Sequence, residues 1–291
     1  MALKQKSRKF AGTAIILSAF MKFLPVVLLS LLIVSCQSVN KVLKNPDPHY
    51  KLRMAEQYYA KKQYGQAQIV FEDIMPYFRG TPEFENIYYK YAYTAYYQKD
   101  YLNAENLFKN YLEIFPKSPR SEEMEYMRAY TFYKQSPKSM LDQTATRDAI
   151  GAMQTFINTH PGSERNKEAT AIIDELRAKL EKKDKDAAQL YFDLGQFRAA
   201  ATAFNTVLNT YPESNQAEFY KLMAIRSYFR YAELSVEEKR AERFETVVEE
   251  CNDFIDRFPN SALTGEVEKL LSQSQDNLKI YTNEPSKTTT E

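Results

Sequence analysis

The chain has 291 residues, 39 of them Lys or Arg and 38 Asp or Glu, so a formal net charge of +1 gives no basic excess for nucleic-acid binding. It holds seven glycines and no tryptophan, but 22 tyrosines and 18 phenylalanines. Few glycines suit helices and many aromatic rings suit the packing of helix pairs, so the composition favours a helical protein.

The N-terminus predicts export. Residues 23–34 form a run of twelve mainly apolar residues. A bilayer needs about 20 residues, so this run has the length of a signal-peptide core rather than a membrane span. It ends at Ser35-Cys36, which resembles the bacterial lipobox, in which a cysteine is lipidated and becomes the new N-terminus. We expect residues 1–35 to be a cleaved signal peptide, with Met21 as an alternative start; an ordinary signal with an incidental cysteine is the competing interpretation.

Cys36 is thus expected to carry a diacylglycerol group and an acyl chain such as palmitate. Each buried CH₂ contributes about 0.8 kcal/mol, so several chains anchor a protein stably. Gln37 stands where an Asp would retain the protein at the inner membrane, by analogy with lipoprotein sorting, so we expect the outer membrane. Without its five leading basic residues the mature chain has 34 basic and 38 acidic residues, a net charge of about −4. Residues 36–48 are polar, with two prolines, and predict a tether.

Five stretches then share a ladder of small or apolar residues in steps of four. Such steps lie on one face of an α-helix, and the proline that closes four of the ladders cannot continue that helix. The ladders are Ala67-Phe71-Met75, Ala104-Phe108-Leu112-Pro116, Ala149-Met153-Ile157-Pro161, Ala200-Phe204-Leu208-Pro212 and Val247-Cys251-Ile255-Pro259. A recurring helical unit predicts an α-solenoid, a fold that presents a long binding surface.

The ladders begin 37, 45, 51 and 47 residues apart, whereas a tetratricopeptide repeat has 34 residues. An insertion near residues 135–146 and one long helix across 163–194 account for part of the excess. We therefore expect five tetratricopeptide-like helix pairs, with repeats 1–3 in residues 49–162, the long linking helix and repeats 4–5 in 163–281, and a disordered tail at 282–291.

No catalytic constellation is visible. The two histidines, His49 and His160, stand alone, and no spacing resembles a zinc site, a phosphate loop or a nucleophile motif. Cys251 fills a ladder position that is Phe in three other repeats, so we expect a buried apolar residue rather than a reactive thiol. The sequence predicts no enzyme, no metal and no cofactor beyond the lipid.

Tyrosines supply the candidate binding residues. Two expected helices repeat the spacing i, i+4, i+7 about 100° away from their inward-facing alanines. The residues are Tyr89, Tyr93, Tyr96, Tyr126, Tyr130 and Tyr133. A ring with a hydroxyl suits capture of an aromatic-rich peptide. Packing between adjacent helices is the equal alternative.

The mature chain resembles the BamD (YfiO) family, lipoproteins of the outer-membrane β-barrel assembly machinery. Beyond the lipobox and the five repeats, the resemblance rests on an ordered series of short motifs from Asp142 to Ser214. The motifs are Asp142-Gln143, Phe156-Ile157, Leu176-Arg177, Ala188-Gln189-Leu190-Tyr191, Gly195, Ala199-Ala200 and Tyr211-Pro212-Glu213-Ser214. The chain departs from the family pattern at Val247 and Cys251, and its first repeat lacks the closing proline.

This resemblance implies a non-catalytic subunit on the periplasmic face of the outer membrane. Its C-terminal repeats would bind the periplasmic domains of a BamA-like Omp85 barrel protein, and its N-terminal repeats would receive unfolded outer-membrane proteins. A periplasmic tetratricopeptide lipoprotein that scaffolds peptidoglycan enzymes is the alternative. A starch-uptake lipoprotein is disfavoured, since those chains are longer and their sugar-binding loops are rich in Trp.

Overall fold

The computed structural model describes residues 39–283. The expected signal peptide 1–35, the expected lipidation site Cys36 and residues 284–291 of the expected tail lie outside this range. The described part of the tail, residues 282 and 283, belongs to the last helix.

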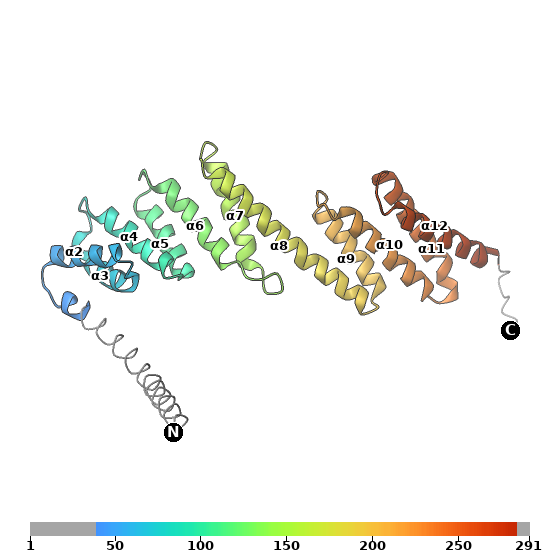
Figure 1. The fold of residues 1–291 in the computed structure, drawn as a ribbon, viewed down its shortest axis with the longest axis horizontal. Helices are drawn as coiled ribbons and strands as arrows, with labels where there is room; N and C mark the ends of the chain where they lie inside the picture. The colour runs from blue at the N-terminus through green and yellow to red at the C-terminus, as the bar shows by residue number, and fades with distance from the viewer. Residues whose placement is uncertain (1–38, 284–291) are drawn as a thin grey trace, which may run out of the picture. The chain divides into compact units, whose positions relative to one another are not determined.

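The described residues contain helices and turns and no strand, which confirms the predicted all-α class (Figure 1). A short helical segment at residues 39–43 precedes the long helices. These are α2 (Pro48–Ala60), α3 (Tyr64–Phe78), α4 (Phe84–Tyr97), α5 (Tyr101–Ile114), α6 (Ser121–Gln135), α7 (Thr144–Thr159), α8 (Asn166–Asp193), α9 (Phe197–Thr210), α10 (Ala217–Glu233), α11 (Glu237–Arg257) and α12 (Thr264–Asn283).

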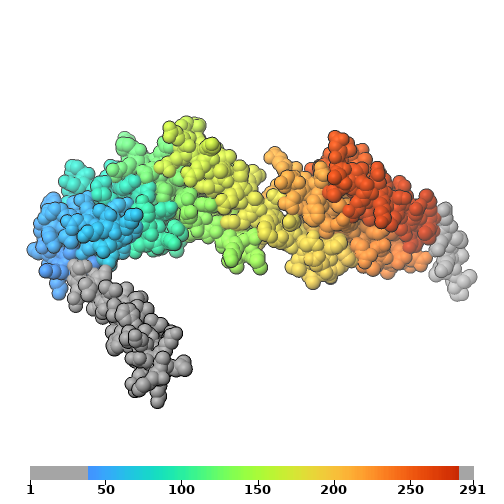
Figure 2. Space-filling model, in the orientation of Figure 1, coloured from blue at the N-terminus to red at the C-terminus, as the bar shows by residue number. Residues whose placement is uncertain are grey.

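The chain divides into two compact units. Unit 1 comprises the described residues up to 135 together with 151–166, and unit 2 comprises 136–150 together with the residues from 167 onward. In unit 1 each helix from α2 to α6 contacts the next, and in unit 2 the same holds from α9 to α12. The colours of the space-filling view therefore change in chain order along each unit (Figure 2). This is the stacking of tetratricopeptide-like helix pairs that the sequence predicts.

The five ladders form the core of these stacks. The first two positions of every ladder are buried, from Ala67 and Phe71 to Val247 and Cys251. Three of the helices end directly before the aromatic residue that precedes the closing proline: Phe115, Tyr211 and Phe258. The ladder interpretation is confirmed.

The predicted insertion and the long helix are also present. The loop between α6 and α7 closes on the buried amide of Gln143, which donates to the carbonyls of Lys138 (2.8 Å) and Leu141 (3.0 Å). Helix α8 runs for 28 residues. Within the segment expected to be a tether, residues 39–43 are helical and bury Val39 and Val42, because apolar residues at i and i+3 share one face.

Three turns between the helices of a pair share one backbone form. Lys62, Lys99 and Gly195 each stand five residues before a ladder alanine and have φ of 58°, 64° and 71°. In each turn the next residue's N–H reaches back five residues, as from Gln63 to the carbonyl of Tyr58, which is the Schellman pattern. The left-handed conformation is strained for lysine and free of strain for glycine.

A recurring polar clamp ties each later turn to an earlier helix. Four ladders continue as Pro-x-Ser, and each serine hydroxyl donates to a glutamate of the helix that precedes the ladder helix. The pairs are Ser118 with Glu85, Ser163 with Glu122, Ser214 with Glu181 and Ser261 with Glu218. Each Oγ also accepts the N–H two residues on. Sequence reasoning missed this clamp, although the fourfold Pro-x-Ser was visible.

Candidate functional site

The six predicted tyrosines come together on α4 and α6 of unit 1, and we call them the tyrosine cluster. Ring centroids lie 4.8 Å apart for Tyr89 and Tyr93 and 6.2 Å for Tyr93 and Tyr96. Tyr96 crosses to Tyr130 of α6 at 6.4 Å. Tyr130 then contacts the last two members, Tyr126 at 5.8 Å and Tyr133 at 5.4 Å. The repeated spacing thus becomes one continuous run of rings.

Burial divides the cluster into two kinds of residue. Tyr93 and Tyr126 are only 7% and 2% exposed, so they pack between helices. The other four rings are half-buried and keep an accessible edge. Of the two interpretations left open by the sequence, packing describes Tyr93 and Tyr126, while capture of a peptide stays a prediction for Tyr89, Tyr96, Tyr130 and Tyr133.

One carboxylate orients the α4 side of the cluster. Glu123 accepts hydrogen bonds from the hydroxyls of Tyr89 (3.1 Å) and Tyr93 (2.5 Å). Burial, and next the Glu123 carboxylate, raise the pKa of the Tyr93 hydroxyl far above its ordinary value; burial also raises that of Tyr89. The hydroxyls therefore stay neutral donors at any physiological pH.

Cations flank the rings. The Arg120 guanidinium lies 4.4 Å from the Tyr89 ring centroid, and that of Arg165 lies 4.8 Å from the Tyr126 ring. The Lys134 ammonium sits 4.7 Å from the Tyr130 ring. Each such contact is worth about 0.5–1 kcal/mol where exposed. Aromatic edges bordered by positive charge suit an aromatic-rich segment that carries a carboxylate.

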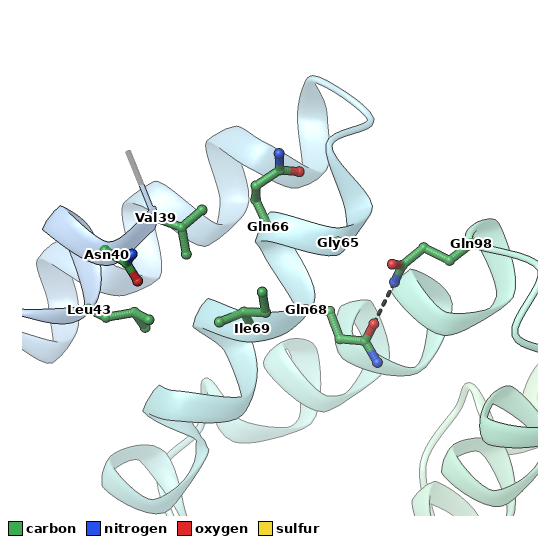
Figure 3. A pocket seen from close by; sticks show the side chains of 8 residues that line it. All are labelled: Val39, Asn40, Leu43, Gly65, Gln66, Gln68, Ile69 and Gln98. Carbon is green, nitrogen blue, oxygen red and sulfur yellow. Dashed lines mark hydrogen bonds between the residues drawn. The ribbon is translucent and has the colours of Figure 1, made fainter. Parts of the chain in front are cut away.

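A separate pocket of about 430 Å³ lies between the 39–43 segment, α3 and the end of α4 (Figure 3). Val39 and Leu43 face Gln66 and Ile69 of α3 across it. Gln98 donates to Gln68 at its α4 side. All its lining residues are uncharged: Val39, Asn40, Leu43, Gly65, Gln66, Gln68, Ile69 and Gln98. A Cβ on Gly65 would stand 3.2 Å from Gln98 Oε1, so glycine keeps this wall open.

Unit 2 has a separate pocket whose lining includes basic side chains. This pocket of about 400 Å³ between α9, α10 and α11 is lined in part by Arg198, Lys239 and Arg243, and Glu242, which pairs with Lys239, also lines it. The Arg243 guanidinium stacks 4.0 Å from the Tyr231 ring. Two leucines are exposed here, Leu190 near the end of α8 and Leu194 in the turn that follows it. This unit thus offers both cationic and apolar contacts.

The remaining candidate chemistry is structural. Cys251 is fully buried, and burial raises the pKa of its thiol to about 12, which confirms the expectation of an unreactive apolar residue. The His160 ring stacks on Phe156 at 5.0 Å. Among residues 39–283 no group of three His, Cys, Asp or Glu side chains could hold a metal ion. No described helix is both long and apolar enough to span a membrane.

Comparison with known proteins gives one family. The model of the YfiO family, described as outer membrane lipoprotein, matches residues 46–243. No curated protein matches the chain by sequence. Among solved structures, the TPR2AB domain of yeast Sti1 with pHSP90 is 12% identical with a TM-score of 0.38, covering 78% of this chain and 98% of that one. The TPR-like repeats of a Podospora anserina kinesin light chain are also 12% identical, with a TM-score of 0.30, covering 75% and 100%.

Proposed function

Since the chain belongs to the YfiO family of outer membrane lipoproteins, we propose that it is an adaptor of the β-barrel assembly machinery. It is anchored through Cys36, on the periplasmic face. Unit 2 holds the periplasmic domains of a BamA-like Omp85 protein, and unit 1 helps to receive unfolded outer-membrane proteins. It performs no catalysis and needs no metal or further cofactor.

The distribution of cysteine supports Cys36 as the lipidated residue. A lipoprotein of this type carries its lipid on a cysteine, and the chain has two. Cys251 is fully buried in the core of unit 2 and its thiol is held protonated. Cys36 is therefore the residue left for the anchor.

The tyrosine cluster is the observation that carries the proposal for substrate. The resemblance implies that unfolded outer-membrane proteins are recognised by a signal at their C-terminus. Such signals are aromatic-rich β-strand segments. Four half-buried rings along α4 and α6 offer them stacking surfaces, and Arg120, Lys134 and Arg165 offer partners for a carboxylate. Rigid tyrosines give large contact area at low entropic cost.

Unit 2 supports the docking of the barrel subunit in a different way. Arg198 and Arg243 line an open pocket, and Leu190 and Leu194 expose apolar area at the C-terminal end of α8 and in the turn after it. Stable interfaces combine such an apolar patch with charge complementarity at the rim.

The test is recovery of partners from the native membrane. We expect the lipidated chain, purified from mildly solubilised outer membranes, to bring down an Omp85 protein in near-stoichiometric amount. Reversal of charge at Arg198 and Arg243 should reduce this recovery, while reversal at Lys117 of unit 1 should not. Recovery of peptidoglycan synthases or hydrolases without any Omp85 protein would instead establish the scaffold alternative.

A further inference from the structure

Four lysines lie within three residues, along the chain, of residues that line the uncharged pocket beside residues 39–43, and we call them the lysine rim. Lys41 and Lys44 adjoin the lining residues Asn40 and Leu43, Lys99 follows Gln98, and Lys62 precedes Gly65 by three residues. All four lysines are exposed, and within residues 39–283 none of them forms an ion pair with a carboxylate. Asp100 directly follows Lys99, but its carboxylate accepts the N–H of Asn103 and so caps α5.

Two of these lysines occupy a backbone position that disfavours them. Lys62 and Lys99 have the left-handed φ that Gly195 has in the matching turn of unit 2. A non-glycine residue in this conformation costs of order 1 kcal/mol or more. The turn itself needs no side chain there, since Gly195 makes the same hydrogen bonds. The turn itself therefore gives no reason for a lysine at these two positions.

Tyrosines stand beside the lysines at this edge of unit 1. Tyr64 and Tyr97 stack at 4.5 Å, and Tyr59 contacts both rings. Tyr97 is exposed, while Tyr59 and Tyr64 are half-buried. Tyrosines beside lysines are typical of surfaces at the membrane–water interface, where rings and long basic side chains reach the headgroup level.

The anchor places the bilayer next to this edge. Only residues 37 and 38 separate Cys36 from Val39, so an extended chain reaches at most about 11 Å from the lipid to the pocket. A lysine rim, amide side chains and the half-exposed Ile69 match in turn a phosphate, the ester groups and the start of an acyl chain.

We propose that this pocket and its lysine rim form a contact site for an anionic phospholipid of the bilayer that holds the anchor. The inference rests on the proposed anchoring at Cys36. It fixes which edge of unit 1 faces the membrane. Tyr97 contacts Tyr96 at 5.5 Å, so the tyrosine cluster begins at this edge. A segment bound along the cluster would then run from the membrane surface into unit 1.

The absence of tryptophan allows a direct test. A single tryptophan is introduced by Ile69→Trp, and as a control by Tyr77→Trp, a 64%-exposed position about 12 Å further along α3. The lipidated mature chain is reconstituted in vesicles that contain brominated phosphatidylglycerol. We expect emission from the tryptophan at position 69 to be quenched strongly and that from position 77 weakly. Equal quenching at the two positions overturns the proposal.

A second experiment measures how much the lysines contribute to vesicle binding in a chain without the lipid anchor. The Cys36→Ser chain is titrated with phosphatidylcholine vesicles, with and without phosphatidylglycerol. Each lysine near an anionic surface is worth about a fivefold change in affinity, so Lys62→Gln with Lys99→Gln should weaken binding roughly 25-fold. Lys117→Gln, in a turn of unit 1 that does not adjoin the pocket, should have no effect. Equal affinity of the double variant and the Lys117 variant overturns the proposal.

Replacement by glycine separates charge from fold. Lys62→Gly with Lys99→Gly relieves the strained φ, so the free energy of unfolding should not fall, while vesicle binding should drop as in the glutamine variant. Retained binding would overturn the proposal. The vesicle titration does not need the lipid anchor on Cys36. Its failure is therefore distinct from failure of the adaptor function, which appears as loss of lipidation at Cys36 or of Omp85 recovery.

Discussion

Units 1 and 2 are built from the same helix pair but use their tyrosines differently. Residues 39–135 hold 16 of the 22 tyrosines, and those of the cluster contact mainly one another. In unit 2, Tyr211 and Tyr220 instead tie helices together by donating to Asp184 and Glu181 of α8. Tyr111 of unit 1 makes the same kind of contact with Glu85, so what sets unit 1 apart is the continuous run of rings in the tyrosine cluster, where we propose that aromatic ligands bind.

The largest expected effect comes from mutations in the hydrophobic core of each unit. Phe108 and Phe204 fill the same ladder position and are both fully buried. Phe→Ala at either site should lower the free energy of unfolding by about 3–5 kcal/mol, through lost burial and the cavity left behind. Urea denaturation followed by circular dichroism measures this. If the units unfold independently, Phe204→Ala shifts only one of two transitions; a uniform shift for both variants would show that the units unfold together.

The next largest effect is expected at the serine–glutamate clamps of the two units. Ser118 donates to Glu85 in unit 1 and Ser214 to Glu181 in unit 2, and in each unit a tyrosine, Tyr111 or Tyr220, shares the carboxylate. Ser→Ala at either position should cost about 1–3 kcal/mol, because a hydrogen bond to a charged group is lost. Thr206→Ala, an exposed change on α9, is the control, for which the unfolding free energy should stay nearly constant.

The unit 1 clamp also predicts a pH dependence. The hydroxyls of Ser118 and next of Tyr111 lower the pKa of Glu85 below its ordinary 4.5. A carboxylate whose pKa is depressed by folding stabilises the fold above its unfolded pKa and loses that contribution as pH falls through the folded pKa. The cost of Ser118→Ala should therefore be full at pH 7 and shrink below about pH 4.5. A cost independent of pH between 7 and 3 would contradict the assignment to Glu85.

Much of the fold could be predicted from the sequence because the ladders are a local signal. Steps of four with a closing proline place Phe71, Phe108 and Phe204 in the core by helix geometry alone. The same reasoning placed six tyrosines on two helix faces, but it could not show which of them are buried and which are half-buried. Tyr93 is buried because α5 brings Phe108 within 5.4 Å of its ring, and such a contact depends on how two helices pack together, which the spacing within one helix does not show.

The pocket at residues 39–43 was missed for a related reason. The segment is too short to show a helical period, and two prolines follow it, so its sequence resembles a tether. Only the structure shows that Val39 and Val42 are buried. The lysines at Lys62 and Lys99 also look ordinary in the sequence. Only their φ values, compared with Gly195 in unit 2, show that they replace the residue the turn prefers.

Mutations in the tyrosine cluster have the smallest expected effect on stability, and they test whether the two units differ in ligand binding. Tyr96→Ala with Tyr130→Ala removes two half-buried rings in contact at 6.4 Å, so a peptide with an aromatic barrel-type signal should bind about 10- to 100-fold more weakly. The free energy of unfolding should change by far less than for Tyr93→Ala, whose ring is buried. Tyr211→Ala in unit 2 is the matched control and should leave peptide affinity unchanged, since the Tyr211 hydroxyl donates to Asp184 of α8 and the residue lies outside the cluster. Fluorescence anisotropy of the labelled peptide measures the affinities. If the double variant binds as the parent does, the cluster is packing in both its parts, and the two units differ in composition but not in the kind of ligand they present a surface to.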